Sequence, residues 1–149
     1  MMAFPRRPVL VLEDSDEDFD TAEEAARGVG LTNPLRRAKT GDACLDLLRG
    51  RGDVEPLRPC MVLLDLNTPG MDGREALVAI RADPSFSRLP VVVLSTSARE
   101  PDVAHCYDHG ANAFHLKPLR HADHLLLVRE VLAYWLARVT LPDVSGSRP

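Results

Sequence analysis

The sequence has few cysteines, no excess of basic residues and no long apolar run, and each shortage excludes a class of protein. The three cysteines lie far apart and none belongs to a CxxC pair, so neither a disulfide framework nor a zinc site is indicated. The formal net charge of -4 gives no basic surface that would attract nucleic acid. The apolar run at Val9 to Leu12 is too short for a signal peptide or a membrane span. We therefore expect a soluble cytoplasmic protein that binds neither nucleic acid nor membrane.

No repeat, linker or low-complexity segment divides the 149 residues, which are enough to bury one core. We expect an N-terminal arm over residues 1–8, a single domain over residues 9–140 and a mostly polar tail over residues 141–149. The sequence predicts no output domain.

Five short apolar runs predict strands, and a helical pattern follows each of them. The expected strands are Val9–Leu12, Leu35–Ala38, Cys60–Leu64, Val91–Leu94 and Ala113–Leu116. The expected helices begin near Ser15, Thr40, Gly73, Glu100 and His121, and the last one runs to Val139. This alternation predicts an α/β fold, a doubly wound parallel sheet with helices on both faces.

The most informative stretch runs from Val62 to Gly73, where an apolar strand ends abruptly in the carboxylate of Asp65 and a proline and glycines then turn the chain. The first strand also ends in acids, Glu13 and Asp14. Because the carboxyl ends of parallel strands meet at one edge, where ligands bind, these three acids should form a single acidic pocket.

Ser95 and Lys117 end two further strands and should border the same pocket. Converging carboxylates repel one another, and a hard divalent cation such as Mg²⁺ relieves this repulsion. A lysine ammonium and a serine hydroxyl could hold phosphoryl oxygens. The set therefore has the parts that phosphoryl transfer to an aspartate requires.

These residues, in this order, resemble the response-regulator receiver domain. The resemblance is carried by the acid pair Glu13-Asp14, Asp65 with Asn67 and the Pro69–Gly73 turn, Ser95, and Lys117-Pro118. It implies a flavodoxin-like fold with five helices and strand order 2-1-3-4-5. It also implies a signalling protein, not an enzyme, that catalyses only its own aspartyl phosphorylation and dephosphorylation.

The resemblance also implies roles for the acidic residues. Asp65 would be the phosphoacceptor, and Mg²⁺ would be bound by Asp14, by Asp65 and by the backbone carbonyl of Asn67. Glu13 would act on the ion through water.

Three residues of the last two strands and their loops have implied roles of a different kind. Ser95 and Lys117 would each hold a phosphoryl oxygen, and the Lys117-Pro118 peptide would be cis. Ser95 and Phe114 would form the switch. Because Phe114 lacks a tyrosine hydroxyl, packing alone would drive its movement.

The second half is similar to the stand-alone regulators paired with bacterial and cyanobacterial phytochrome kinases. The similar segments are Ala82-Asp83-Pro84, Leu89–Ser97, Tyr107–Ala113, and Tyr134-Trp135-Leu136 with Leu141-Pro142. This similarity implies that a light-sensing sensor histidine kinase, a bacteriophytochrome, donates the phosphoryl group. The downstream protein is unknown.

The final helix has two apolar arcs, and one sheet cannot cover both. Leu127, Val131 and Tyr134 form the second arc. It predicts a homodimer through the fourth helix, the fifth strand and the fifth helix, unless these side chains are only scattered surface apolar residues.

Two other functions fit parts of the sequence. Asp65-Leu66-Asn67-Thr68 has a passing likeness to the DxDxT motif of hydrolases with an aspartyl-phosphate intermediate, although Asn67 lacks the second carboxylate that would act as acid and base. An unphosphorylated receiver-like adaptor is the third possibility, but no group needed for phosphorylation is missing.

Overall fold

The computed structural model describes residues 6–143, in which five parallel strands form one sheet in the order β2-β1-β3-β4-β5. This arrangement confirms the predicted fold class and strand order. The strands are β1 (Val9–Leu12), β2 (Leu35–Ala38), β3 (Met61–Asp65), β4 (Val91–Ser95) and β5 (Ala113–Leu116). Residues 1–5 of the predicted arm and residues 144–149 of the predicted tail lie outside the described residues.

Five α-helices connect and follow the strands, as predicted. They are α1 (Asp16–Gly28), α2 (Gly41–Arg49), α3 (Gly73–Ala82), α4 (Glu100–Asp108) and α5 (His121–Ala133). A 3₁₀ turn, η1 (Pro84–Phe86), follows α3, and a π-helical turn, η2 (Tyr134–Arg138), continues α5. Side-chain oxygens of Ser15, Thr40 and Asp72 accept hydrogen bonds from the first turns of α1, α2 and α3 and so fix where these helices begin.

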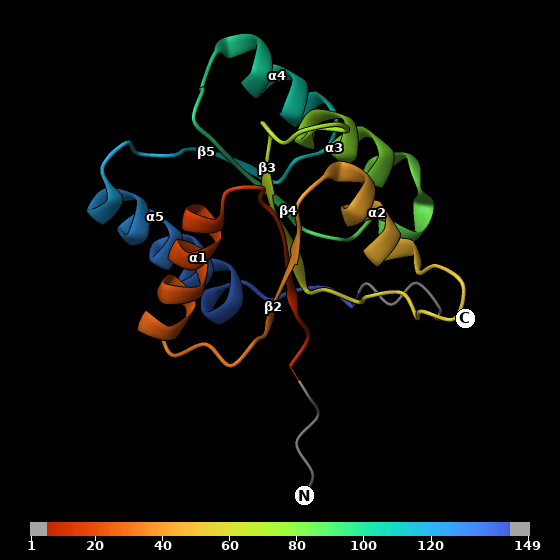
Figure 1. The fold of residues 1–149 in the computed structure, drawn as a ribbon, viewed down its shortest axis with the longest axis horizontal. Coiled ribbons are helices and arrows are strands. Elements are labelled where there is room, and N and C mark those ends of the chain that lie inside the picture. The colour runs from red at the N-terminus through yellow and green to blue at the C-terminus, as the bar shows by residue number, and fades with distance from the viewer. Residues whose placement is uncertain (1–5, 144–149) are drawn as a thin grey trace, which may run out of the picture.

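The sheet separates two apolar layers, which Figure 1 shows as two groups of helices. Helices α1 and α5 cover one face, and α2, α3 and α4 cover the other. Because side chains alternate along a strand, Val9 and Val11 point into the first layer and Leu10 and Leu12 into the second. All four residues of β1 and all five of β3 and β4 are buried, as expected for central parallel strands.

The second apolar arc predicted for the last helix is largely covered within one chain. Val131 is 4% exposed and Leu127 is partly buried, both within the α1–α5 layer. The expected exposure of Val131 is therefore wrong, because α1 packs along α5 and covers the side that the sheet leaves open. Among the three residues predicted for the dimer interface, Tyr134 is the most open, at 58% exposed.

Gly73 ties the start of α3 to the end of β3. Its N–H donates to the carbonyl of Leu66 at 3.1 Å, and a Cβ at this position would collide with the backbone carbonyl of Asp65. Only glycine permits this close approach. The loop that follows Asp65 is therefore held against the helix that it leads into.

Candidate functional site

The candidate site is built from the ends of four neighbouring strands. Glu13 directly follows β1, Asp65 is the last residue of β3, Ser95 is the last residue of β4, and Lys117 directly follows β5. The order β1-β3-β4-β5 places these ends side by side at the carboxyl edge of the sheet. The structure thus brings together the residues that the sequence predicted to meet.

The three predicted acids form a cluster that could hold a metal ion. Glu13, Asp14 and Asp65 each offer a carboxylate oxygen, and these oxygens lie within 4.8 Å of one another. Glu13 and Asp65 are buried, whereas Asp14 is exposed. Oxygen ligands from a few carboxylates, with one side open to water, suit a hard cation such as Mg²⁺. The residues present therefore fit the ion that the sequence predicts.

Lys117 supplies the positive charge of the site. Its Nζ donates to Glu13 Oε1 at 2.7 Å and to Asp18 Oδ2 at 2.9 Å, and it lies 3.4 Å from Asp65 Oδ2. Burial on its own lowers the pKa of this ammonium, but the charges of Asp65 and Glu13 and the hydrogen bonds to Glu13 and Asp18 raise the pKa above its ordinary value. Lys117 is therefore charged at neutral pH.

Glu13 is held in an unusual state by the same surroundings. Burial raises its pKa to about 7, against the lowering by Lys117 and with a further rise from the charge of Asp65. Its Oε2 accepts a hydrogen bond from the Ser15 N–H at 3.2 Å. Near neutral pH and without an ion, this side chain is divided between the neutral and the charged form.

Asp65 has a different partner at each carboxylate oxygen. Oδ1 accepts a hydrogen bond from the Asn67 N–H at 3.1 Å, while Oδ2 faces Lys117. The neighbouring Ser95 is fully buried, and its Oγ accepts a hydrogen bond from the Ser97 N–H at 3.2 Å. The hydroxyl therefore lies on the strand next to Asp65, as the sequence predicts.

Phe114, the predicted switch aromatic, is partly buried and packs against the layer formed by α2, α3 and α4. Its backbone N–H donates to the hydroxyl of Tyr107 on α4 at 3.2 Å. This bond links α4 to the edge strand, and nothing in the sequence pattern around Tyr107 indicates it.

The prediction of a cis Lys117-Pro118 peptide is wrong, since the described residues contain no cis peptide bond. The N–H of Lys117 donates to the Ser95 carbonyl at 2.7 Å and so continues the pairing of β5 with β4. An extended residue before a proline accommodates the trans peptide.

Sequence reasoning also missed the contact of Asp18 with Lys117, because Asp18 has a sufficient local explanation as an acid in the first turn of a helix. Its position three residues after the N-cap Ser15 gives no signal for this contact, because a side chain there commonly turns back toward the cap.

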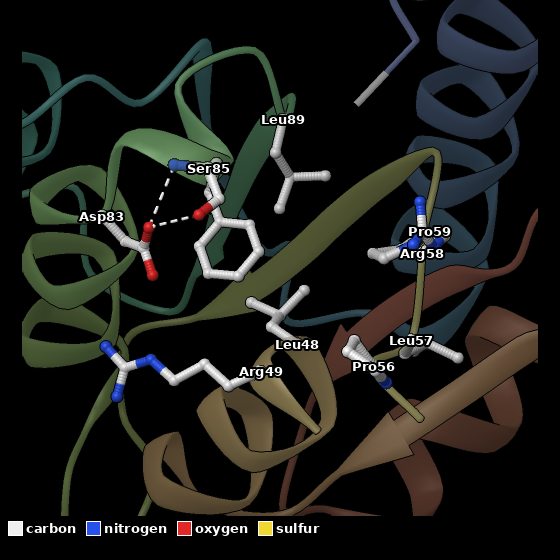
Figure 2. A pocket seen from close by; sticks show the side chains of 10 residues that line it. Leu48, Arg49, Pro56, Leu57, Arg58, Pro59, Asp83, Ser85 and Leu89 are labelled. Atoms are coloured by element: carbon white, nitrogen blue, oxygen red, sulfur yellow. Dashed lines mark hydrogen bonds between the residues drawn. The ribbon is translucent and has the colours of Figure 1, made fainter. Parts of the chain in front are cut away.

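The pocket in Figure 2 is separate from these residues. It has a volume of about 240 Å³ and lies at the opposite edge of the sheet, where Pro59 precedes β3 and Leu89 precedes β4. Its walls mix apolar and polar side chains, and Asp83 Oδ1 accepts hydrogen bonds from the N–H and the Oγ of Ser85. None of the candidate site residues lines this pocket. The candidate site lies at the carboxyl edge of the sheet and is not part of the pocket.

Comparison with known proteins gives a consistent set of relatives. The response regulator receiver domain family matches residues 9–129. The response regulator Rcp1 of Synechocystis sp. is 36% identical over 139 residues, which cover 93% of this chain and 95% of that protein. The crystal structure of the phosphorylated cyanobacterial phytochrome response regulator RcpA superposes with a TM-score of 0.87 at 34% identity, covering 92% of this chain and 99% of that one. The Mn²⁺-bound form of Rcp1 gives a TM-score of 0.87 at 36% identity and covers 91% of this chain and 99% of its own.

Within residues 6–143, no helix has both the length and the apolar character needed to cross a membrane.

The raised pKa of Glu13 predicts that Mg²⁺ binding strengthens as the pH rises. Below about pH 7 Glu13 carries a proton, which opposes binding of a cation to the cluster. One proton released with this pKa corresponds to a gain of about tenfold in affinity between pH 6 and pH 8. Calorimetric Mg²⁺ titrations at several pH values measure this change in affinity. In Glu13→Gln the affinity for Mg²⁺ should change little between pH 6 and pH 8. An equally steep dependence in Glu13→Gln would contradict the assignment to Glu13.

Proposed function

Because the chain belongs to the response regulator receiver domain family, we propose that it takes a phosphoryl group from the phosphohistidine of a sensor kinase onto Asp65. The observation that carries this proposal is the convergence at Asp65. Two other carboxylates offer oxygens within 4.8 Å of its own, and the ammonium of Lys117 lies 3.4 Å away. Acids that can hold a cation and a lysine at one aspartate are what phosphoryl transfer to that aspartate needs.

In the proposed reaction, a carboxylate oxygen of Asp65 forms a bond to phosphorus as the bond from phosphorus to the histidine nitrogen breaks. The electron pair of the broken bond remains on the imidazole of the kinase. The Asn67 N–H already fixes the orientation of the Asp65 carboxylate, and Lys117 is placed to pair with a phosphoryl oxygen. Asp14, Asp65 and the Asn67 carbonyl would hold Mg²⁺, with Glu13 acting through water, and the bound ion would neutralise the phosphoryl charge.

The proposed response to phosphorylation passes through β4 and β5. The Ser95 hydroxyl, now bonded to the Ser97 N–H, turns to a phosphoryl oxygen. The chain from Ser95 to Ala98 follows, and Phe114 repacks on the neighbouring strand. This changes the surface near α4 that a downstream protein contacts.

Asp65→Asn tests the phosphoacceptor. Acetyl phosphate with Mg²⁺ should label the wild-type protein with one acid-stable, base-labile phosphoryl group, and the variant should lose the label because an amide is not a nucleophile toward phosphorus. Phosphate-affinity electrophoresis or intact-mass measurement detects the label. Asp20→Asn, which makes the same change at an exposed position of α1, should label like wild type.

An unlabelled wild-type protein would contradict the proposed function and leave an adaptor role. Steady release of phosphate from monoesters in place of a stable label would support the hydrolase.

We further propose that the phosphoryl donor is a phytochrome-type histidine kinase. The support is the similarity over nearly the full chain to Rcp1 and to the cyanobacterial phytochrome response regulator RcpA.

Incubation with a panel of autophosphorylated histidine kinases tests this pairing. Transfer to Asp65 should be at least about tenfold faster from a phytochrome kinase than from the other kinases, a difference of about 1.4 kcal/mol in transition-state binding. It should also follow the red or far-red state of that kinase. Equal transfer from all donors would contradict the pairing.

We also propose a homodimer through α4, β5 and α5. Of the three residues that the sequence predicts for this contact, Tyr134 remains exposed in the monomer. Seven large apolar side chains are exposed among the described residues, and five of them lie between α4 and η2. They are Tyr107, Leu116, Leu119, Leu126 and Tyr134. All five belong to α4, β5, α5 or the segments that directly follow β5 and α5, which are the elements of the proposed contact.

Leu126→Lys tests the dimer better than a change at the partly buried Leu127. A lysine at this position, which is 53% exposed in the monomer, leaves the core intact but places a charge in the contact. Sedimentation should show the dimer mass for wild type and the monomer mass for the variant. Val78→Lys on α3, exposed but outside this surface, is the matched control. Identical masses for wild type and Leu126→Lys would remove the proposed surface.

A further inference from the structure

A fourth acid, Asp18 of α1, contacts the lysine of the site. Lys117 Nζ donates to Asp18 Oδ2 at 2.9 Å, closer than the 3.4 Å that separates it from Asp65 Oδ2. The Lys117 side chain is 4% exposed and that of Asp18 is 29% exposed. The pair is therefore only partly screened by water, and its geometry is that of a charge-assisted hydrogen bond.

The local role expected for Asp18 does not explain where its side chain lies. An acid three residues after an N-cap commonly accepts a hydrogen bond from the N-cap N–H. Here the Ser15 N–H donates to Glu13 Oε2 at 3.2 Å, and the Asp18 carboxylate turns to Lys117. The side chain is thus directed at the site and not at the start of its own helix.

Three carboxylates share one ammonium, which has three N–H groups. Glu13 and Asp18 hold the two short contacts, at 2.7 Å and 2.9 Å, and Asp65 has the long one. A phosphoryl group on Asp65 would bring new oxygen acceptors to the side where Lys117 is held most loosely. To pair with them fully, the ammonium must leave one of its short contacts.

We propose that Asp18 is a positioning residue that competes with the phosphoryl group on Asp65 for the ammonium of Lys117. This inference rests on the proposed function and adds a regulator to it. Asp18 holds the ammonium toward α1 in the unphosphorylated protein and so weakens the ion pair between Lys117 and the phosphoryl group. Of the two short contacts, the one with Asp18 is released, because Asp18 is the more exposed of the two acids and water can solvate its carboxylate.

His124 of α5 lies next to the Asp18 carboxylate and senses its charge. Its Nδ1 lies 3.9 Å from Asp18 Oδ1, and its side chain is 9% exposed. The charged and titratable groups that act on it are Asp18, Lys117 and His121. Burial lowers the pKa of His124, Asp18 raises it, and Lys117 and His121 lower it further. When Lys117 moves toward Asp65, its share of the opposition to Asp18 weakens, so His124 gains a proton more easily.

Binding of beryllofluoride, a phosphoryl analogue, with saturating Mg²⁺ tests the competition. Asp18→Asn keeps the shape of the side chain and a hydrogen-bond acceptor but removes the charge. The variant should bind beryllofluoride about threefold to tenfold more tightly than wild type, the range expected for losing one partly buried charged competitor. Asp20→Asn, which removes a charge from the exposed side of the same helix, should bind like wild type.

The imidazole NMR signals of His124 give a readout that a purely structural role of Asp18 would not move. Beryllofluoride should shift the titration of His124 upward in wild type and shift it clearly less in Asp18→Asn, in which Lys117 is not held toward α1. An affinity within about 1.5-fold of wild type in Asp18→Asn, or a wild-type His124 titration that beryllofluoride does not change, overturns the role of Asp18. Absence of beryllofluoride binding in wild type and in both variants overturns the proposed function, and this inference with it.

Discussion

The site depends on one buried ammonium shared by acids from separate parts of the chain. Lys117 contacts Glu13 after β1, Asp18 on α1 and Asp65 at the end of β3. Burying Glu13 and Asp65 together without a cation would be costly, because like charges repel and neither is well solvated. In the described chain it is Lys117 that contacts both of these acids, so the last strand has to end where the first and third strands end.

The strand order meets this requirement. Right-handed crossovers place β1 and β3 at the centre of the sheet and bring β4 and β5 onto one side of β3. The apolar layers then fix the strands by their alternate side chains, with α1 and α5 on one face and the other helices on the opposite face. The collision that a Cβ on Gly73 would make shows how tightly the loop after Asp65 is packed. A mobile loop would not give Asp65 a fixed partner at each oxygen.

The sequence was sufficient for the features that are set locally or by strand direction. Apolar runs ending in Asp65, Ser95 and Lys117 predicted both the strands and the edge at which these residues meet. The sequence was not sufficient where a contact between distant elements decides whether a side chain is buried or what it binds. Val131 is buried because α1 lies along α5, a packing that the pattern of either helix alone does not reveal. The bond of Asp18 to Lys117 spans 99 positions of sequence, and an acid in the first turn of a helix has a sufficient local explanation without it.

The place of β5 at the border of the sheet has a mechanical consequence. In the described chain, β5 forms its ladder with β4 alone, through four paired positions. A displacement of β5 therefore strains one ladder, whereas moving β1 or β3 would strain two. Glu13 and Asp65 stand at the ends of interior strands, whereas Lys117 follows β5, one of the two edge strands, which also carries Phe114. A change in the contacts of Lys117 can therefore displace β5 at the expense of one ladder, while the strands that carry the acids keep both of theirs.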